Sequence, residues 1–157
     1  MKSLKYLLFL FIFSTSVLFS FAQEKPIITK VAKFKPPIVK TFLGNNQNGD
    51  SVELAKASRL IALPLQIKDN KNNEYAIDSY QFLYRQKGYL QDEETGKVKV
   101  VFTIKSDRFF NTPLPESWVN SLKNVFQKDE QLYFFDIVVK DKEGRRFFAP
   151  ELKITIK

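Results

Sequence analysis

Residues 131–144 read QLYFFDIVVKDKEG, and this stretch decides how the rest of the chain is arranged. Its first ten residues are rich in β-branched and aromatic side chains, which predicts a strand. The closing Asp-Lys-Glu-Gly can form a type I turn with Gly144 in the left-handed conformation. Beyond the turn, Leu152, Ile154 and Ile156 alternate with polar residues. The pattern predicts a β-hairpin whose apolar face must be covered by a second layer.

Four further strands are predicted before this hairpin, at 38–42, 60–67, 75–86 and 98–104. The third alternates in its second half, so that Tyr80, Phe82 and Tyr84 are expected in the core. The fourth is the most regular, and its alternate apolar residues are expected to face inward; they are Val98, Val100, Phe102 and Ile104. Between the third and fourth strands, residues 87–97 are predicted to form an exposed, mobile connection.

Two short helices complete the predicted elements. The first spans 52–58, with Asp50 or Ser51 as its cap. The second spans 115–124, where Trp118 and its apolar neighbours recur at helical spacing. Six or seven short strands, two helices and no regular alternation of strand and helix predict an all-β fold with minor α content, namely an antiparallel Ig-like β-sandwich. A two-layer α+β domain, with the Trp118 helix across one sheet, is the alternative.

The beginning of the chain has the pattern of a secretory signal peptide. Two lysines precede a mostly apolar stretch that ends in Ser20-Phe21-Ala22. An uncleaved membrane anchor is the alternative, but no basic cluster follows to stop transfer. The protein is therefore expected to be exported, to the periplasm or outside the cell, with membrane contact only through the uncleaved leader. The predicted division is a signal peptide at 1–22 cleaved after Ala22, a linker at 23–37 and a domain at 38–157.

The charge of the chain is basic, with 25 Lys and Arg, 17 Asp and Glu and a net charge of +8 over 157 residues. Basic proteins often bind nucleic acid or anionic surfaces. Export argues against nucleic acid, and the lysines alternate with apolar residues as they do on the solvated face of a sheet. No nucleic-acid partner is therefore expected.

The residue types that carry most catalytic and metal chemistry are missing. Histidine and cysteine are absent, which excludes imidazole and thiol catalysis, their metal sites and disulfides. The acidic run Asp92-Glu93-Glu94 lacks the spacing of a calcium loop, so we predict a solvated loop. Asp136 interrupts an apolar strand, and a buried Asp136 would need Arg145 or Arg146 as its partner. We therefore predict no catalytic residue, no metal and no cofactor.

Several short motifs follow one another in a defined order between Pro37 and Lys157. They are Leu43-Gly44 with Gly49, the segment 51–57, Ser79-Tyr80-Gln81-Phe82, the segment 118–126, Tyr133 to Ile137 and the closing 154–157. In this order they resemble the C-terminal periplasmic domain of GldM, the inner-membrane component of the gliding-motility and type IX secretion machine of Bacteroidetes. The resemblance implies an exported Ig-like sandwich that binds another envelope protein.

The expected function is accordingly that of a non-enzymatic binding or scaffolding module of the cell envelope, associated with gliding motility or type IX secretion. A domain that binds or hydrolyses envelope polymers, and a secreted cargo or inhibitor, are the alternatives. Loops at one end of the sandwich are the expected contact surface, because exposed aromatic and Arg side chains make good interface anchors. The residues are Tyr89, Leu90, Arg108, Phe109 and Phe110. Alternatively, these aromatic side chains cap the open end of the core.

Overall fold

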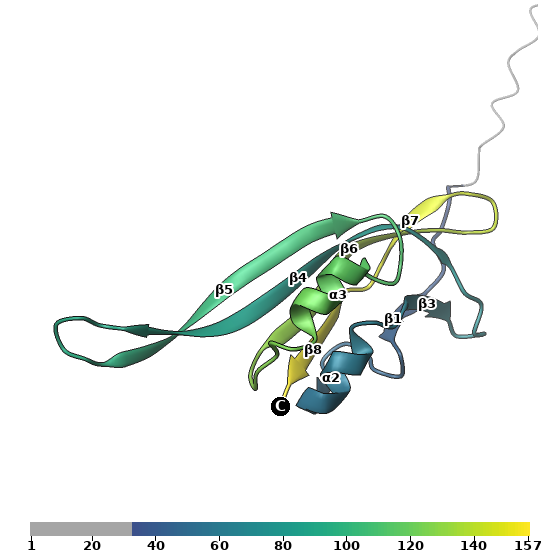
Figure 1. The fold of residues 1–157 in the computed structure, drawn as a ribbon. Helices are drawn as coiled ribbons and strands as arrows, with labels where there is room; N and C mark the ends of the chain where they lie inside the picture. Colours follow the sequence, from purple (N-terminus) through teal and green to yellow (C-terminus); the bar gives the residue numbers. More distant parts are fainter. Residues whose placement is uncertain (1–32) are drawn as a thin grey trace, which may run out of the picture. The chain divides into compact units, whose positions relative to one another are not determined.

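The computed structural model describes residues 33–157 (Figure 1). The predicted signal peptide at 1–22 and most of the linker at 23–37 lie outside the described residues. Within 33–157, none of the helices is long and apolar enough to cross a membrane. Residues Lys35–Lys157 form one compact unit.

The larger sheet has six strands, and the stretch that opened the sequence analysis is at its centre. Strand β6 pairs with β4 along one edge and with β7 and then β8 along the other. The order across the sheet is β2-β8-β6-β4-β5, and all pairs are antiparallel except β2 with β8. The strand bounds are β2 Ser51–Val52, β4 Ala76–Gln91, β5 Val98–Phe109, β6 Gln131–Lys140, β7 Arg146–Ala149 and β8 Leu152–Ile156.

A second layer covers one face of this sheet. It consists of a two-stranded sheet and two short helices, with bounds β1 Val39–Leu43, β3 Leu65–Asp69, α2 Leu54–Leu60 and α3 Glu116–Leu122. The Thr41 hydroxyl on β1 donates to the carbonyl of Pro150 at 2.5 Å, and the Trp118 ring of α3 packs on Phe82 of β4. The fold is therefore mainly β with minor α content and a sandwich-like arrangement of layers, as predicted.

The core lies between these layers and confirms the alternation seen in two segments. Tyr80, Phe82 and Tyr84 are fully buried, and Phe82 packs on Phe134 of β6 with ring centroids 4.8 Å apart. The apolar residues of β8 are buried as well; they are Leu152, Ile154 and Ile156. Each of these side chains stabilises the fold by about 1.5–3 kcal/mol when it leaves water.

The turn after β6 also forms as predicted. Gly144 has a φ of +79°, and the Asp141 carboxylate accepts hydrogen bonds from the backbone N–H groups of Glu143 and Arg145, both at 2.9 Å. The second arm is not one strand, because it divides into β7 and β8 at Pro150, which has no N–H to donate to the ladder. Small boundary errors occur elsewhere: Leu60 ends helix α2, so the strand predicted at 60–67 begins only at Leu65.

The prediction for β5 was wrong. Its alternate apolar residues are exposed, at 61%, 52%, 38% and 64% for Val98, Val100, Phe102 and Ile104. The mobile connection predicted at 87–97 was also wrong, since β4 continues to Gln91 and β5 begins at Val98. The physical reason is that β6 pairs with β4 only as far as Arg85, so the rest of the β4–β5 hairpin extends beyond the layers that bury the core.

Candidate protein-binding surface

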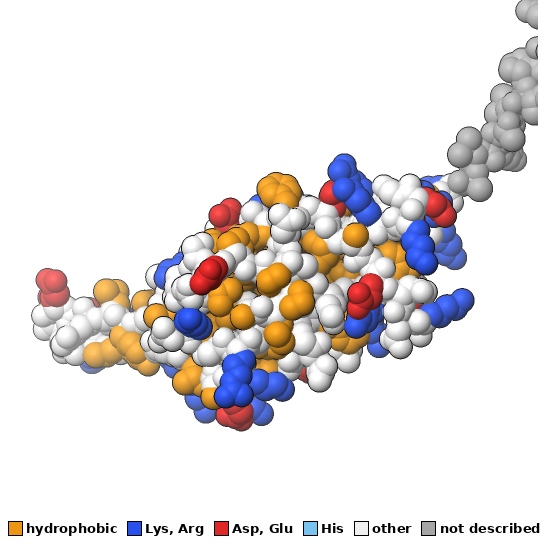
Figure 2. Space-filling model, turned by 45° about the vertical axis from the view of Figure 1, so that its right-hand side comes forward, with side chains coloured by type: hydrophobic (Ala, Val, Ile, Leu, Met, Phe, Trp, Pro, Cys, Tyr) orange, Lys and Arg blue, Asp and Glu red, His pale blue; other side chains and the backbone are white. Residues whose placement is uncertain are grey.

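The outer part of the β4–β5 hairpin is the most distinctive surface of the domain. We call residues 86–91 and 98–103, with the turn between them, the hairpin arm. In Figure 1 it extends past the other strands, and in Figure 2 hydrophobic side chains lie along it. Its strands pair only with each other. The arm therefore exposes both of its faces.

One face of the arm carries a row of exposed apolar side chains, mostly from β5, beside polar residues of β4. Residues directly opposite each other in an antiparallel pair share a face, and the register sets Tyr89 opposite Val100 and Arg85 opposite Ile104. Five exposed side chains, four on the arm and Ile104 just beyond it, form what we call the apolar stripe: Tyr89, Val98, Val100, Phe102 and Ile104. The Arg85 guanidinium lies 3.6 Å from the centroid of the Phe102 ring, a cation–π contact that holds this ring in place.

The base of the arm is held by a buried carboxylate, that of Glu130. It accepts hydrogen bonds from the Tyr84 hydroxyl, from the Lys87 backbone N–H at 2.8 Å and from the Gln127 backbone N–H at 2.7 Å. Burial, and then the hydrogen bond to Glu130, raise the pKa of Tyr84 well above its ordinary value of 10.0. The carboxylate thus ties the point where the arm leaves the sheet to the loop before β6.

A second contact at the base is an ion pair. Lys87 Nζ lies 3.0 Å from the Asp129 carboxylate, whose hydrogen bond raises the pKa of Lys87. The sequence did not predict that the Glu130 carboxylate anchors the arm, because Glu130 is a single acid between a turn and an apolar strand. Two of its three donors, Tyr84 and Lys87, are distant in the sequence, so no local pattern marks it. Together the two contacts hold the arm in a defined direction.

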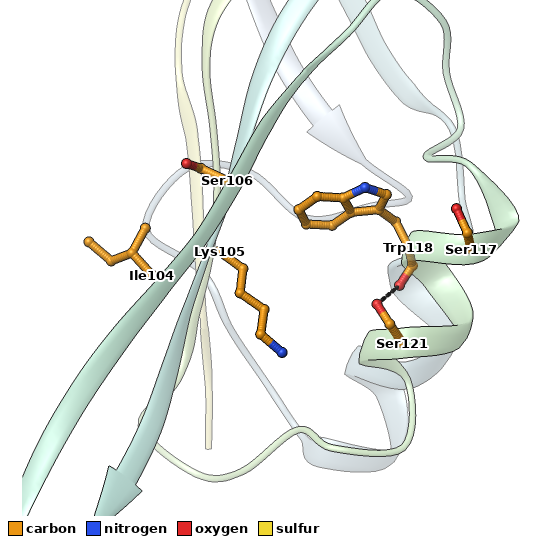
Figure 3. A pocket seen from close by; sticks show the side chains of 6 residues that line it. All are labelled: Ile104, Lys105, Ser106, Ser117, Trp118 and Ser121. Carbon is orange, nitrogen blue, oxygen red and sulfur yellow. Dashed lines mark hydrogen bonds between the residues drawn. The ribbon is translucent and has the colours of Figure 1, made fainter.

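Strand β5 is also an edge strand. Within residues 33–157, no strand pairs with its second edge. An open groove of about 550 Å³ lies between this strand and α3. It is lined by Ile104, Lys105, Ser106, Ser117, Trp118 and Ser121 (Figure 3). An unpaired strand beside a groove offers both backbone hydrogen-bonding groups and a place for side chains.

Neighbouring side chains of β5 point to opposite sides of the strand at the groove. In Figure 3, Lys105 and Trp118 point into the space between β5 and α3, whereas Ile104 points to the other side of the strand. The Trp118 ring is fixed by edge-to-face contacts with Phe82 and Phe109, with centroids 5.8 and 5.4 Å apart. The groove therefore has an aromatic wall held by ring contacts and an exposed lysine on its opposite side.

The charge along this edge is positive. Strand β5 and the residue before it carry four exposed cations and one acid; they are Lys97, Lys99, Lys105, Arg108 and Asp107. No ion pair within the described part of the chain involves these cations. Asp107 accepts a hydrogen bond from the backbone N–H of Arg108 at 2.7 Å. The edge is thus suited to a negatively charged partner.

The five residues predicted as a contact surface do not lie at one end of the domain. Tyr89 and Leu90 are in the exposed arm, on opposite faces. The other three, Arg108, Phe109 and Phe110, are at the far end of the same hairpin, where Phe109 is opposite Tyr80. Tyr80 and Tyr89 are nine residues apart in one strand, which is ~30 Å.

The prediction of a single end surface was wrong for a physical reason: β4 is one strand of 16 residues, not a shorter strand followed by a loop. Within the second group, Phe109 is buried against Tyr80 and Trp118, as the capping interpretation expects, and Phe110 is exposed.

The aspartates that the sequence analysis considered for chemical roles, Asp136 and Asp92, accept hydrogen bonds from neighbouring side chains. Asp136 is exposed at a positive φ of +47°, and its carboxylate accepts a hydrogen bond from Gln81 Nε2 at 2.6 Å. Its suggested partners are engaged elsewhere, Arg146 with Asp78 and Arg145 with Asp141. The buried ion pair considered for Asp136 therefore does not form.

The acidic run beginning at Asp92 lies in the turn at the tip of the arm. Hydrogen bonds from the Thr95 hydroxyl and backbone N–H, both at 2.8 Å, lower the pKa of Asp92. Nowhere in residues 33–157 do three side chains of His, Cys, Asp or Glu come together as a metal site would need. The carboxylate of Asp92 thus closes the turn of the hairpin.

No protein-family model, no curated protein and no solved structure matches this chain. Fold and surface together define a mainly β domain with a projecting, anchored hairpin and a free strand edge.

Proposed function

We propose that this protein is a non-enzymatic binding module whose contact surface is the hairpin arm together with the free edge of β5. The observation that carries the proposal is the apolar stripe, which is exposed although its backbone is well ordered by the β4–β5 ladder. Exposed apolar side chains that lie together on one surface are typical of an interaction site.

The anchoring of the arm supports the same conclusion. Exposed apolar side chains do nothing for the stability of the domain, and a long apolar edge strand promotes aggregation. A hairpin that served only to connect β4 to β5 would be less prone to aggregation if it were shorter and closed by a polar turn. Here a buried carboxylate and an ion pair hold the base of the arm, so its presentation to a partner is pre-organised.

The setting that we propose for this interaction is the cell envelope. The leader pattern at 1–22 indicates export, and the resemblance to the GldM C-terminal domain suggests a component of the gliding or type IX secretion apparatus as the partner.

The test is site-specific photocrosslinking in cells that produce the protein. A photoreactive phenylalanine replaces Tyr89 on the arm in one variant and Phe148 on β7 in the other. The two positions are matched, since both are aromatic strand residues, with exposed fractions of 61% and 73%. We expect position 89 to yield one dominant crosslinked envelope protein that position 148 does not.

The identified protein is then produced separately and its affinity for the mature chain is measured. Replacing Val100 and Ile104 by Thr removes much of the apolar stripe and is expected to weaken binding by about tenfold or more. Equal crosslinking at both positions, or unchanged affinity of the Thr variant, would refute the arm as the contact surface.

A further inference from the structure

We propose that the partner contributes an extended, acidic segment that adds as a strand to the free edge of β5, beside the groove under α3. This inference rests on the proposed function and specifies the chemistry of the partner.

The backbone of β5 is suited to strand addition. The strand has 12 residues without proline, so each residue has an N–H and a carbonyl. One edge is paired with β4 along its whole length. On the second edge, the groups that do not point toward β4 are available to a partner strand, except the Arg108 N–H, which donates to the Asp107 carboxylate. Main-chain hydrogen bonds of this kind are the basis of recognition by strand addition.

The two faces of an added strand would have different surroundings. On the face covered by α3, its side chains would lie beside Lys105 and enter the groove next to Trp118. On the opposite face, they would extend the apolar stripe beside Ile104 and Phe102. Side chains alternate along a strand, so the fitting segment alternates apolar residues with acidic or polar ones.

The charge of the edge favours an acidic segment over a second copy of the chain. If two β5 strands paired antiparallel with Phe102 at the centre, Lys99 of each copy would be opposite Lys105 of the other. With Val101 at the centre, Lys97 would be opposite Lys105, whereas with Thr103 at the centre Lys99 would be opposite Asp107. In every register, however, two strands that each carry a net positive charge would lie side by side. Like charges directly opposite each other destabilise a strand pair. An acidic strand instead places a carboxylate against each of these cations.

The experiment uses the mature chain from residue 23 onward, labelled with ¹⁵N, and three synthetic peptides of nine residues. One alternates valine with glutamate, one has the same composition in shuffled order, and one alternates valine with lysine. Hydrogen exchange of the β5 amides is followed with and without each peptide. We expect the alternating acidic peptide to slow the exchange of alternate β5 amides, and to shift the Trp118 indole signal.

A charge swap tests the role of the cations. Lys99→Glu combined with Lys105→Glu is expected to weaken binding of the acidic peptide by about tenfold and to allow the lysine peptide to bind. The matched control changes two exposed lysines away from this edge, Lys56→Glu with Lys142→Glu, and alters the net charge equally. We expect the control to bind the acidic peptide as the wild type does.

Each other outcome overturns the proposal. No protection of the β5 amides by the acidic peptide, or equal binding of the shuffled one, excludes strand addition by an acidic segment. Protection that rises with protein concentration alone identifies a second copy as the occupant. A Trp118 shift with soluble peptidoglycan fragments, without β5 protection, identifies a polymer site. If the acidic peptide does not protect β5 but crosslinking at position 89 succeeds, the proposed function stands and the strand-addition mechanism is refuted.

Discussion

The buried carboxylate of Glu130 allows a quantitative prediction. In Glu130→Ala, three donors lose their acceptor: the Tyr84 hydroxyl and the backbone N–H groups of Lys87 and Gln127. An unsatisfied buried donor costs about 1–3 kcal/mol. Because water enters part of the space that the side chain leaves, we expect the free energy of unfolding to fall by roughly 3–6 kcal/mol.

A loss of this size is a large part of the stability of an ordinary domain, about 5–15 kcal/mol. Urea unfolding at neutral pH measures it, with the fluorescence of Trp118, the only tryptophan of the chain, and far-UV circular dichroism as two probes. Glu130→Gln keeps one carbonyl oxygen, so its expected loss is smaller, roughly 1–3 kcal/mol. The exposed Glu93→Ala serves as the control and should stay within about 0.5 kcal/mol of the wild type.

The role of Glu130 would be refuted if Glu130→Ala unfolded at the same urea concentration as Glu93→Ala with an unchanged slope. Hydrogen exchange adds a local readout. The amides of Lys87 and its neighbours in the arm should exchange faster in Glu130→Ala, even under conditions where the core strands remain protected.

Two further predictions concern acid and burial. The pKa of Asp69 is lowered to about 2 from 3.8, first by the hydrogen bond from the Asn73 side chain. Its contribution is therefore present above pH ~4 and lost as the pH falls toward 2, and NMR exchange of the Asn73 amide should show the β3–β4 turn loosening in that window, with no such change in Asp69→Asn. Ile104→Thr should alter the free energy of unfolding by less than about 0.5 kcal/mol, whereas Ile154→Ala should lower it by about 2–5 kcal/mol; equal effects in urea unfolding would contradict the exposure of β5.

Local sequence pattern was sufficient to predict features that depend only on residues within one strand or turn. The alternation through Tyr80, Phe82 and Tyr84 predicted the buried face of β4, and Gly144 predicted the turn after β6, because both depend on neighbouring residues and on backbone geometry. The mainly β class and the amphipathic helix at Trp118 were predictable for the same reason.

The exposure of the apolar stripe could not be predicted from the sequence, because it is decided by tertiary structure. Alternation says that Val100 and Ile104 share a face, but not whether a second layer covers that face, and in β5 none does. The length of β4 was decided by its pairing with β5, which separates Tyr89 from Phe109. Glu130 acquires its role only when Tyr84, distant in the sequence, comes within hydrogen-bonding reach. The sequence alone determined which side chains lie on the same face of a strand. Only the packing of the layers decided which faces are buried, because burial depends on elements that are far away along the chain.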